Sequence, residues 1–454
     1  MKKIAVVLLS TVVCGTLASA KIVQQFEPEK DTSAFKGKPE VSFAVDLAFY
    51  YQGINQAWAG KNAYNQNYTG PIGVYDSAKG TTSNTNNPWN APGNATVGGD
   101  TEGGLSLPAA NFDIDAKIMS GFNVKLQTML ASHHHNETYV KGGYATIDNL
   151  DFIAPGFLSG FMKDATIKIG VNDINYGDDQ YRRTDNANVM KNPFINNLAV
   201  DAADQGTHIE LLYRIPAISS FVVVGITNGQ ANPQDTAESD GTGYTSNTYA
   251  YYGKVGFDHQ YNDDWRLRIT ESLYSVSGVN RQDLYMGDKS GNVIRNVYGS
   301  GNTSVISSGW DPTRNYTKST AYTSAPDVFA SKTNLFLKYQ DTELYGMYEI
   351  IDAADVRDKS IKVNHYAVDL VQRFYNDKFW AALRYEKAVQ EYAEYVDDFG
   401  DAELTQYQAA LGWFLSKNAV AKLEYIKQER ENFSLYNGGK AKFDGFMVNA
   451  ALSF

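Results

Sequence analysis

Cysteine is nearly absent from this sequence, and what is missing excludes two large classes of protein. The 454 residues include one cysteine, Cys14, and 12 prolines. A small extracellular domain held together by disulfides is therefore excluded. Beyond the first 20 residues there is no long apolar run, and the mean hydropathy is −0.38, which excludes a membrane protein built from helices. Helical periodicity is also missing from most of the chain.

The single apolar run lies at the start and has the organisation of a secretory signal peptide. Two lysines precede the apolar stretch 4–13, and an Ala-Ser-Ala cleavage site ends at Ala20. We expect residues 1–20 to be removed after Ala20. Cys14 lies within the removed segment. It is not expected to carry a lipid, because the residue before it is not the small residue typical of a lipoprotein signal. The exported chain then uses no disulfides.

Acidic residues outnumber basic ones, 51 to 40, which does not favour a nucleic-acid partner and suits a surface that faces the external medium. There is no G-x-S-x-G motif and no glycine-rich phosphate loop. We therefore expect neither enzyme activity nor a cofactor. The run His133-His134-His135 is the best candidate for a metal site, but no third ligand has a useful spacing, so exposed loop histidines are favoured.

What the sequence does contain is period-two alternation in short pieces along almost its whole length. Val41, Phe43 and Val45 alternate with smaller or polar residues, and so do the apolar residues of 446–454. The polar face carries full charges, for example Asp46. A soluble sandwich buries the apolar face of such strands, whereas a barrel in lipid turns that face outward. The alternation alone is compatible with both.

The connections between these pieces decide between the two architectures. Short turns such as 120–121 alternate with long polar stretches such as 53–107 and 278–328, and two connections are irregular, because 134–138 is short and 150–163 is long. Short periplasmic turns and long extracellular loops are typical of outer-membrane barrels. The sequence therefore predicts an all-β fold, a transmembrane antiparallel β-barrel of about sixteen strands, one hairpin either way. The expected strands are 41–52, 109–119, 122–133, 138–149, 164–175, 205–215, 220–229, 249–261, 265–277, 330–340, 343–352, 363–374, 378–388, 404–415, 419–430 and 443–454.

The expected organisation is a signal peptide (1–20), a short periplasmic N-terminal segment (21–40) and a barrel (41–454). The last strand should close the ring against the first, because an open sheet edge is not tolerated in lipid. The terminal aromatic residue, Phe454, resembles the signal by which the outer-membrane assembly machinery selects its clients. We therefore expect the protein in the outer membrane of a Gram-negative bacterium, in contact with lipid and lipopolysaccharide.

The stretch 164–197 resembles the strand-then-loop passage of porins in the phosphate-selective porin O and P superfamily. The resemblance implies a porin of sixteen strands that forms a homotrimer. It does not imply phosphate as the solute, because members of the superfamily vary in substrate. The elements that carry the resemblance are Lys168-Ile169-Gly170 in the strand and Asn192-Pro193-Phe194 in the loop.

The loop 176–204 is the third external loop, which in sixteen-stranded porins folds inward and narrows the pore. Opposed charges at such a constriction create a transverse field that governs selectivity. The alternative is a loop packed outside the barrel with ordinary solvated charges. The residues expected at the constriction are Asp178, Asp179, Arg182, Arg183 and Asp185.

Strand parity places a set of basic residues on the face that would line the lumen. Acidic residues on the same face, such as Glu386 and Glu424, nearly cancel them, which argues against a strongly anion-selective pore. The lumen-lining basic residues are Lys125, Lys168, Arg214, Arg266, Arg268, Arg373 and Arg384.

These features predict a channel for the passive diffusion of small hydrophilic solutes or ions. The alternative is a surface barrel whose long external loops, 53–107 and 278–328, bind a partner or a substrate. A gated transporter would need an N-terminal plug, and residues 21–40 look too short and too charged to form one.

Overall fold

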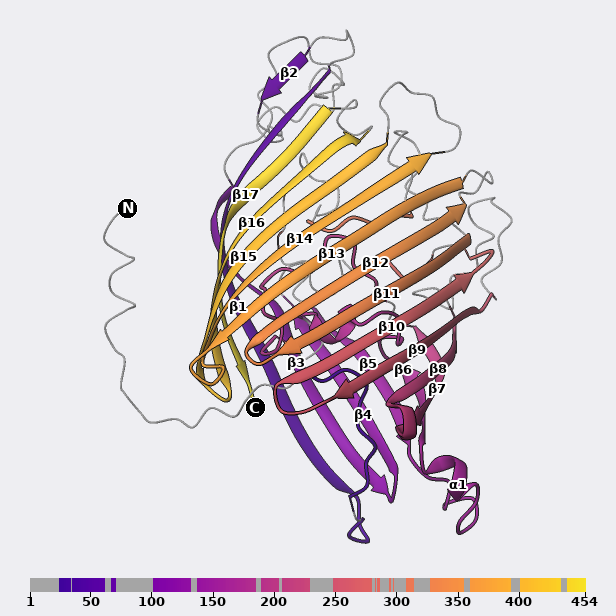
Figure 1. The fold of residues 1–454 in the computed structure, drawn as a ribbon. Helices are drawn as coiled ribbons and strands as arrows, with labels where there is room; N and C mark the ends of the chain where they lie inside the picture. The colour runs from indigo at the N-terminus through magenta and orange to yellow at the C-terminus, as the bar shows by residue number, and fades with distance from the viewer. Residues whose placement is uncertain are drawn as a thin grey trace.

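A single antiparallel sheet of 17 strands closes on itself in the computed structural model of this protein (Figure 1). The short strand β2 (Asn67–Gly70) pairs with the far end of β1 (Glu40–Lys61), so the ring itself consists of the other sixteen strands. The structure describes residues 24–33, 35–61, 67–70, 101–131, 137–184, 189–203, 206–228, 248–279, 282, 284–285, 294, 297, 308–313, 327–354, 360–392, 401–433 and 439–454.

Each strand of the ring pairs with the next one along the chain, which is the up-and-down arrangement. All sixteen predicted strands are present, and the predicted fold class is confirmed. The remaining strands are β3 (Thr101–Met119), β4 (Phe122–Ala131), β5 (Glu137–Ile147), β6 (Ala165–Val171), β7 (Thr207–Ile215), β8 (Ser220–Thr227), β9 (Ala250–Gln260), β10 (Trp265–Val276), β11 (Asp327–Tyr339), β12 (Thr342–Ala354), β13 (Ser360–Phe374), β14 (Phe379–Tyr392), β15 (Ala402–Ser416), β16 (Ala419–Phe433) and β17 (Gly439–Ser453).

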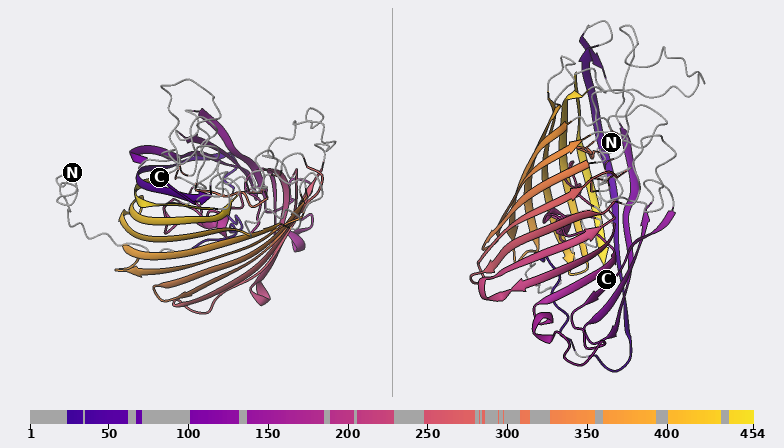
Figure 2. Two further views of the ribbon diagram at one scale, coloured as in Figure 1. Left: turned by 90° about the horizontal axis from the view of Figure 1, so that it is seen from above. Right: turned by 90° about the vertical axis from the view of Figure 1, so that its right-hand side faces the viewer.

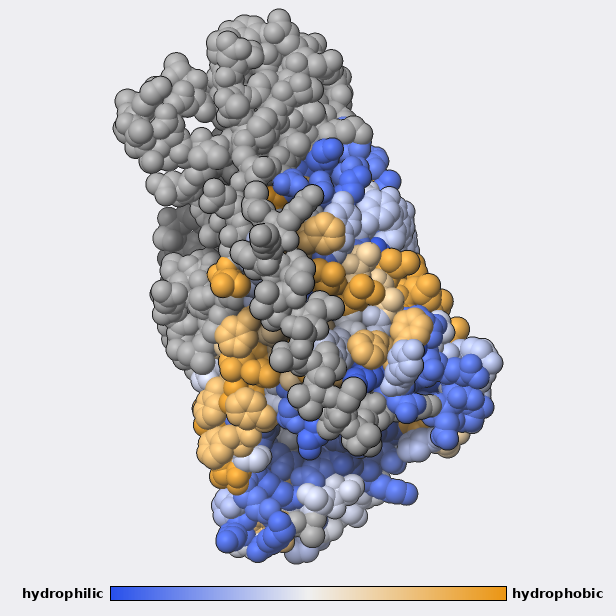
Figure 3. Space-filling model, turned by 90° about the vertical axis from the view of Figure 1, so that its left-hand side faces the viewer, coloured by the Kyte–Doolittle hydropathy of each residue, from blue (hydrophilic) through white to orange (hydrophobic). Residues whose placement is uncertain are grey.

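The two faces of the strands reverse the usual distribution of polarity. On β13, Asp369 is fully buried, whereas its neighbours Val368 and Leu370 are each 45% exposed. On β17, Val448 is 47% exposed and Asn449 is buried. Figure 3 shows hydrophobic side chains gathered in a band on one side of the barrel, with hydrophilic side chains below it. Apolar residues outside and charges inside are what lipid requires and what water disfavours.

The ring closes where its first and last strands meet. β1 pairs with β3 along one edge and with β17 along the other. The backbone N–H of Val45 donates to the carbonyl oxygen of Phe454 at 2.7 Å, and the N–H of Phe454 donates back to Val45 at 2.9 Å. The terminal phenylalanine is therefore the last residue of the closing pair, and the predicted closure is confirmed.

Two strands are much longer than expected, whereas the other boundaries lie within four residues of the predicted ones. β1 continues to Lys61, and β3 begins at Thr101, so strand residues occupy both ends of the expected loop 53–107. β1 extends because it keeps its pairing with β17 as far as Ala59, and β3 extends because it pairs with β1 as far as Thr101, opposite Ile54.

The turns at one end of the barrel are short, apart from the connection between β5 and β6. That connection contains a short helix, α1 (Ser159–Met162), at the lower right of Figure 1. No helix in the described part of the chain is long and apolar enough to cross a membrane.

Candidate functional site

The connection between β6 and β7 lies inside the barrel. Nearly all of its described residues, 172–184, 189–203 and 206, are buried, although no strand pairing covers them. A buried connection needs partners for its polar groups. Those partners are mainly inward-facing side chains of strands from β9 to β16, so this connection, here termed the inner loop, lies within the ring of strands (Figure 2).

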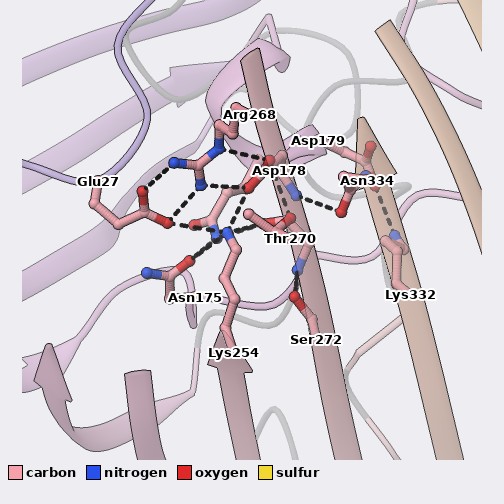
Figure 4. A network of polar contacts seen from close by, with 12 residues as sticks. Glu27, Asn175, Asp178, Asp179, Lys254, Arg268, Thr270, Ser272, Lys332 and Asn334 are labelled. Atoms are coloured by element: carbon pink, nitrogen blue, oxygen red, sulfur yellow. Dashed lines mark hydrogen bonds and ion pairs between the residues drawn. The ribbon is translucent and has the colours of Figure 1, made fainter. Parts of the chain in front are cut away.

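The first anchor of the inner loop is Asp178, which is fully buried. The guanidinium of Arg268 on β10 donates to both of its carboxylate oxygens at 2.8 Å, and the Lys254 ammonium on β9 lies 2.5 Å away (Figure 4). Burial raises the pKa of Asp178, but these two cations outweigh it and hold the pKa below its ordinary value. Asp178 therefore stays ionised at neutral pH and holds the loop to the β9–β10 wall.

A glycine allows the chain to approach the wall at this point. Gly177 has φ +69, and a Cβ atom there would lie 2.7 Å from Cδ of Lys332 on β11. Its N–H donates to the hydroxyl of Ser272 at 3.1 Å. A larger residue would both strain the backbone and push the loop from the wall.

Asp179 and Arg182 bond to the next stretch of wall. The Lys332 ammonium lies 2.6 Å from the Asp179 carboxylate, which also accepts a hydrogen bond from the Tyr345 hydroxyl. Arg182 donates to Asp369 on β13 at 3.3 Å, and its guanidinium lies over the Tyr345 ring at 4.7 Å. Asp179 and Arg182 therefore each have an opposite charge on the wall.

Arg183 differs from Arg182 in its partner. It donates to Asp201 of the same loop at 2.6 Å, and both side chains are buried. The two adjacent arginines therefore make different contacts: Arg182 bonds to the wall, and Arg183 joins the two halves of the loop. Asp185 lies outside the described residues.

The second half of the inner loop is held by carboxylates of the β14–β16 wall. Glu386 on β14 accepts the backbone N–H groups of Ala199 and Val200, at 2.9 and 3.0 Å. Glu424 on β16 accepts those of Ile195 and Asn196, at 2.6 and 3.4 Å. Two buried carboxylates thus satisfy four loop amides that have no secondary-structure partner.

Two further wall residues bind the loop through its carbonyl oxygens. The Lys422 ammonium on β16 donates to the carbonyls of Asn192 and Phe194, at 2.6 and 3.2 Å. The Trp380 indole on β14 donates to the carbonyl of Pro193 at 3.0 Å. The Asn-Pro-Phe element of the sequence is therefore the part of the loop whose carbonyl oxygens bond to the β14–β16 wall.

A buried histidine joins two of the anchoring carboxylates. On β13, Nδ1 of His365 lies 3.1 Å from Glu349, and Nε2 lies 3.1 Å from Glu386. Glu349 also accepts the hydroxyls of Tyr176 and Tyr285, at 2.9 and 2.7 Å. One histidine therefore connects the carboxylates that hold the beginning and the end of the inner loop.

The basic residues expected along the lumen are each bonded to another group. Arg266, for example, forms a bidentate pair with Asp258 at 2.7 and 2.8 Å. Carboxylates oppose five of the seven residues, whereas Lys168 and Arg214 bond to carbonyl or hydroxyl oxygens. The other partners are Asp113 for Lys125, the Asp173 carbonyl for Lys168, Thr166 and the Pro28 carbonyl for Arg214, Asp178 and Glu27 for Arg268, Glu343 for Arg373 and Asp369 for Arg384.

No cluster of three or more metal-ligating side chains occurs among the residues that the structure describes. The run His133-His134-His135 lies outside them, so its interpretation as exposed loop histidines stays a prediction.

Comparisons with known proteins show the fold. No model of a protein family and no curated protein sequence matches the chain. It is similar to the outer membrane channel DcaP of Acinetobacter baumannii, with a TM-score of 0.54 and 9% identity over 93% of this chain and 99% of that one. The fold is that of an outer-membrane porin.

Two further structures align over most of the chain with lower scores. One is OmpT, an outer-membrane protein of Vibrio cholerae (TM-score 0.49, 11% identity, 93% of this chain and 100% of that one). The other is an anion-selective porin from Comamonas acidovorans (TM-score 0.46, 10% identity, 92% of this chain and 100% of that one). The resemblance to porins is confirmed for the fold, whereas the closer relation to the porin O and P superfamily stays a prediction.

Proposed function

We propose that this chain forms a water-filled outer-membrane channel for the passive diffusion of small hydrophilic solutes or ions. A ring of sixteen strands is wide enough for an aqueous lumen. The observation that carries the proposal is the inner loop, which is bonded inside the ring to walls on two sides, at Asp178 and at Glu386. A loop held in this way would narrow the lumen.

The charges at the inner loop support a weakly selective passage. Asp179 and Arg182 lie one helical turn apart and pair with opposite charges on the wall, Lys332 and Asp369. Charges of both signs at a narrow point create a transverse field rather than a strong preference for one sign. We expect a modest ion preference and exclusion by size.

The setting that we propose is the outer membrane of a Gram-negative bacterium, where lipid and lipopolysaccharide surround the barrel. The chain would lose residues 1–20, would be recognised by the assembly machinery through the strand ending at Phe454, and would act as a homotrimer. Apolar side chains on the outer face of β17 and the closing pair at Phe454 support membrane insertion.

The test is the conductance of single channels in a planar bilayer, with the reversal potential measured under a KCl gradient. Stable conductance steps would support the channel, and steps in threes would support a trimer. The sign of the reversal potential ranks cations against anions. Silence from correctly folded protein, judged by its heat-modifiable mobility, would refute the open channel and favour partner binding by the long connections that follow β1 and β10.

Arg182 offers a narrower test of the constriction. We expect Arg182→Gln to move the reversal potential toward cations, because it removes a positive charge of the inner loop beside Asp369. The matched control is Lys387→Gln on the outside of β14, where the lysine pairs with Glu403 and faces away from the lumen. Unchanged conductance and reversal potential in Arg182→Gln would contradict the role of the inner loop in selectivity.

A further inference from the structure

Residues 24–33, before the first strand, also lie within the ring. Phe26 is 5% exposed and packs edge-on against Phe336 of β11 and Tyr181 of the inner loop, with ring centroids 5.4 and 5.9 Å apart. The guanidinium of Arg268 lies 4.2 Å from the centroid of the Phe26 ring. A phenylalanine at a flexible chain end rarely becomes this buried unless the segment has a defined position.

The next residue, Glu27, forms ion pairs with the same wall. Arg268 donates to one carboxylate oxygen at 2.8 Å and lies 2.8 Å from the other, and the Lys254 ammonium lies 3.1 Å away. Glu27 and Asp178 thus share the two cations from different sides (Figure 4). Burial raises the pKa of Glu27, but Lys254 and Arg268 outweigh it and lower the pKa, so the carboxylate is ionised at neutral pH.

The other end of the segment is fixed to a different wall. The Lys30 ammonium donates to the carbonyl of Ala165 at 2.8 Å, at the start of β6. Asp31 accepts from Lys117 of β3 at 2.9 Å and from Asn123 of β4 at 3.0 Å. In the strand order, β3 and β4 lie almost halfway round the ring from β10 and β11. Residues 24–33 therefore cross the lumen rather than follow one wall.

The crossing lies near the end of the barrel that carries the short turns. Asn123 and Ala165 are close to the turn ends of their strands, and so is Arg266, whose guanidinium donates to the carbonyl of Gln24 at 2.6 Å. The inner loop meets the segment from the other side, since the Gln24 side chain donates to the Tyr181 carbonyl at 3.2 Å. The two elements form one continuous obstruction of the lumen.

We propose that residues 24–33 form an internal strap that narrows the channel near the short-turn end, and that Glu27 of this strap is a determinant of ion selectivity. The inference deepens the proposed function and rests on it. Without Glu27, the cations Lys254, Arg266 and Arg268 face only Asp178 and Asp258. The local balance then becomes positive, which favours anions in a narrow passage.

The experiment compares single-channel recordings of the full-length protein with three variants. Glu27→Gln removes the charge that pairs with Lys254 and Arg268. Glu403→Gln is the matched control, because it makes the same change on the outer face of β15, where Glu403 pairs with Lys387. Deletion of residues 24–31 removes the strap and leaves residues 1–20 intact for export. Heat-modifiable mobility reports whether each variant has folded.

We expect the deletion to raise the conductance and Glu27→Gln to shift the reversal potential toward anions, with a much smaller shift for Glu403→Gln. Equal shifts for both glutamines, or no shift, overturn the role of Glu27. A conducting wild-type protein whose conductance does not change on deletion refutes the strap alone. If the deletion variant fails to fold, the difference in reversal potential between the two glutamine variants decides whether Glu27 determines ion selectivity.

Failure of the channel itself has a different signature. If the wild-type protein and the folded deletion variant are both silent, the proposed function fails, and the strap fails with it. If the wild-type protein is silent and the deletion variant conducts, the strap closes the ring, which supports the strap and contradicts the open channel of the proposed function.

Discussion

Replacement of Glu386 by glutamine tests how the inner loop is held in place. The Glu386 carboxylate accepts the N–H groups of Ala199 and Val200 at 2.9 and 3.0 Å, and it also accepts a hydrogen bond from the Gln406 amide at 3.0 Å. Glutamine keeps the shape of the side chain but offers one acceptor oxygen in place of two. Its oxygen should take the Oε1 position, where both loop N–H groups point, so that its amide nitrogen faces the donating amide of Gln406.

The expected loss follows from the number of bonds. A hydrogen bond to a charged acceptor contributes about 1.5–3 kcal/mol. With its oxygen at the Oε1 position, the glutamine keeps both loop bonds, but the acceptor is now neutral. A bond to a neutral acceptor contributes about 0.5–1.5 kcal/mol, so the docked loop should lose about 2 kcal/mol over the two bonds. That is roughly a 30-fold change in the ratio of docked to undocked loop. Glu424 still holds Ile195, so the loop loosens without leaving the barrel.

The assay is single-channel recording combined with limited proteolysis. We expect Glu386→Gln to add brief transitions to higher conductance and to speed cleavage within 189–203. Glu403→Gln, on the outer face of β15, is the control that should leave both unchanged. If Glu386→Gln has the open-channel noise and cleavage rate of the wild-type protein, the carboxylate does not hold the loop and the reasoning is refuted.

Three further predictions concern stability and pH. Arg183→Met leaves the buried carboxylate of Asp201 without its guanidinium, so the inner loop should lose about 3–5 kcal/mol and be cleaved faster by protease; an unchanged rate would contradict the pairing. Because the pKa of Asp178 is lowered by Arg268 and Lys254, its stabilising effect is complete above the ordinary carboxyl pKa of about 4 and is lost only as the pH falls through the lowered folded value. Because Asp178 stays ionised, it should cause no change in conductance between about pH 7 and about pH 5. A change in conductance over this range that is present in the wild-type protein and absent from Asp178→Asn would contradict the prediction. Val448→Arg places a charge on the outer face and should lower the free energy of unfolding in lipid vesicles by about 2–4 kcal/mol, measured by urea titration, whereas no change would mean that this face does not contact lipid.

The number and order of the strands could be predicted from the sequence because the signals are local. Alternation along 443–454 and along 41–52 depends on neighbouring residues, and the short turns contain their own turn-forming residues. Sorting short and long connections to opposite ends then selected a lipid-facing barrel over a soluble sandwich. The boundaries of β1 and β3 differed most, where pairing continues beyond the apolar pattern, and other boundaries differed by up to four residues, as at the end of β6 and the start of β17.

The alternation of inward and outward residues along a strand could place a charge on the inner face, but it could not predict the partner of that charge. Arg182 and Arg183 are adjacent and look alike in the sequence, yet one bonds to β13 and the other to its own loop. Glu386 and Glu424 were recognisable as inward-facing acids, but not as acceptors for loop amides. His365 gave no local signal at all, because its two carboxylate partners lie on neighbouring strands.

The sequence by itself determined a closed ring of sixteen strands with apolar residues outside and charges inside, since hydrophobic period and turn chemistry act over a few residues. Only the tertiary structure decided which bonds hold the inner loop and residues 24–33 inside the ring. The bonds from Glu386 to Ala199 and from Arg268 to Glu27 join residues far apart in the chain. Such contacts depend on the path of the backbone across the lumen, and no periodicity encodes that path.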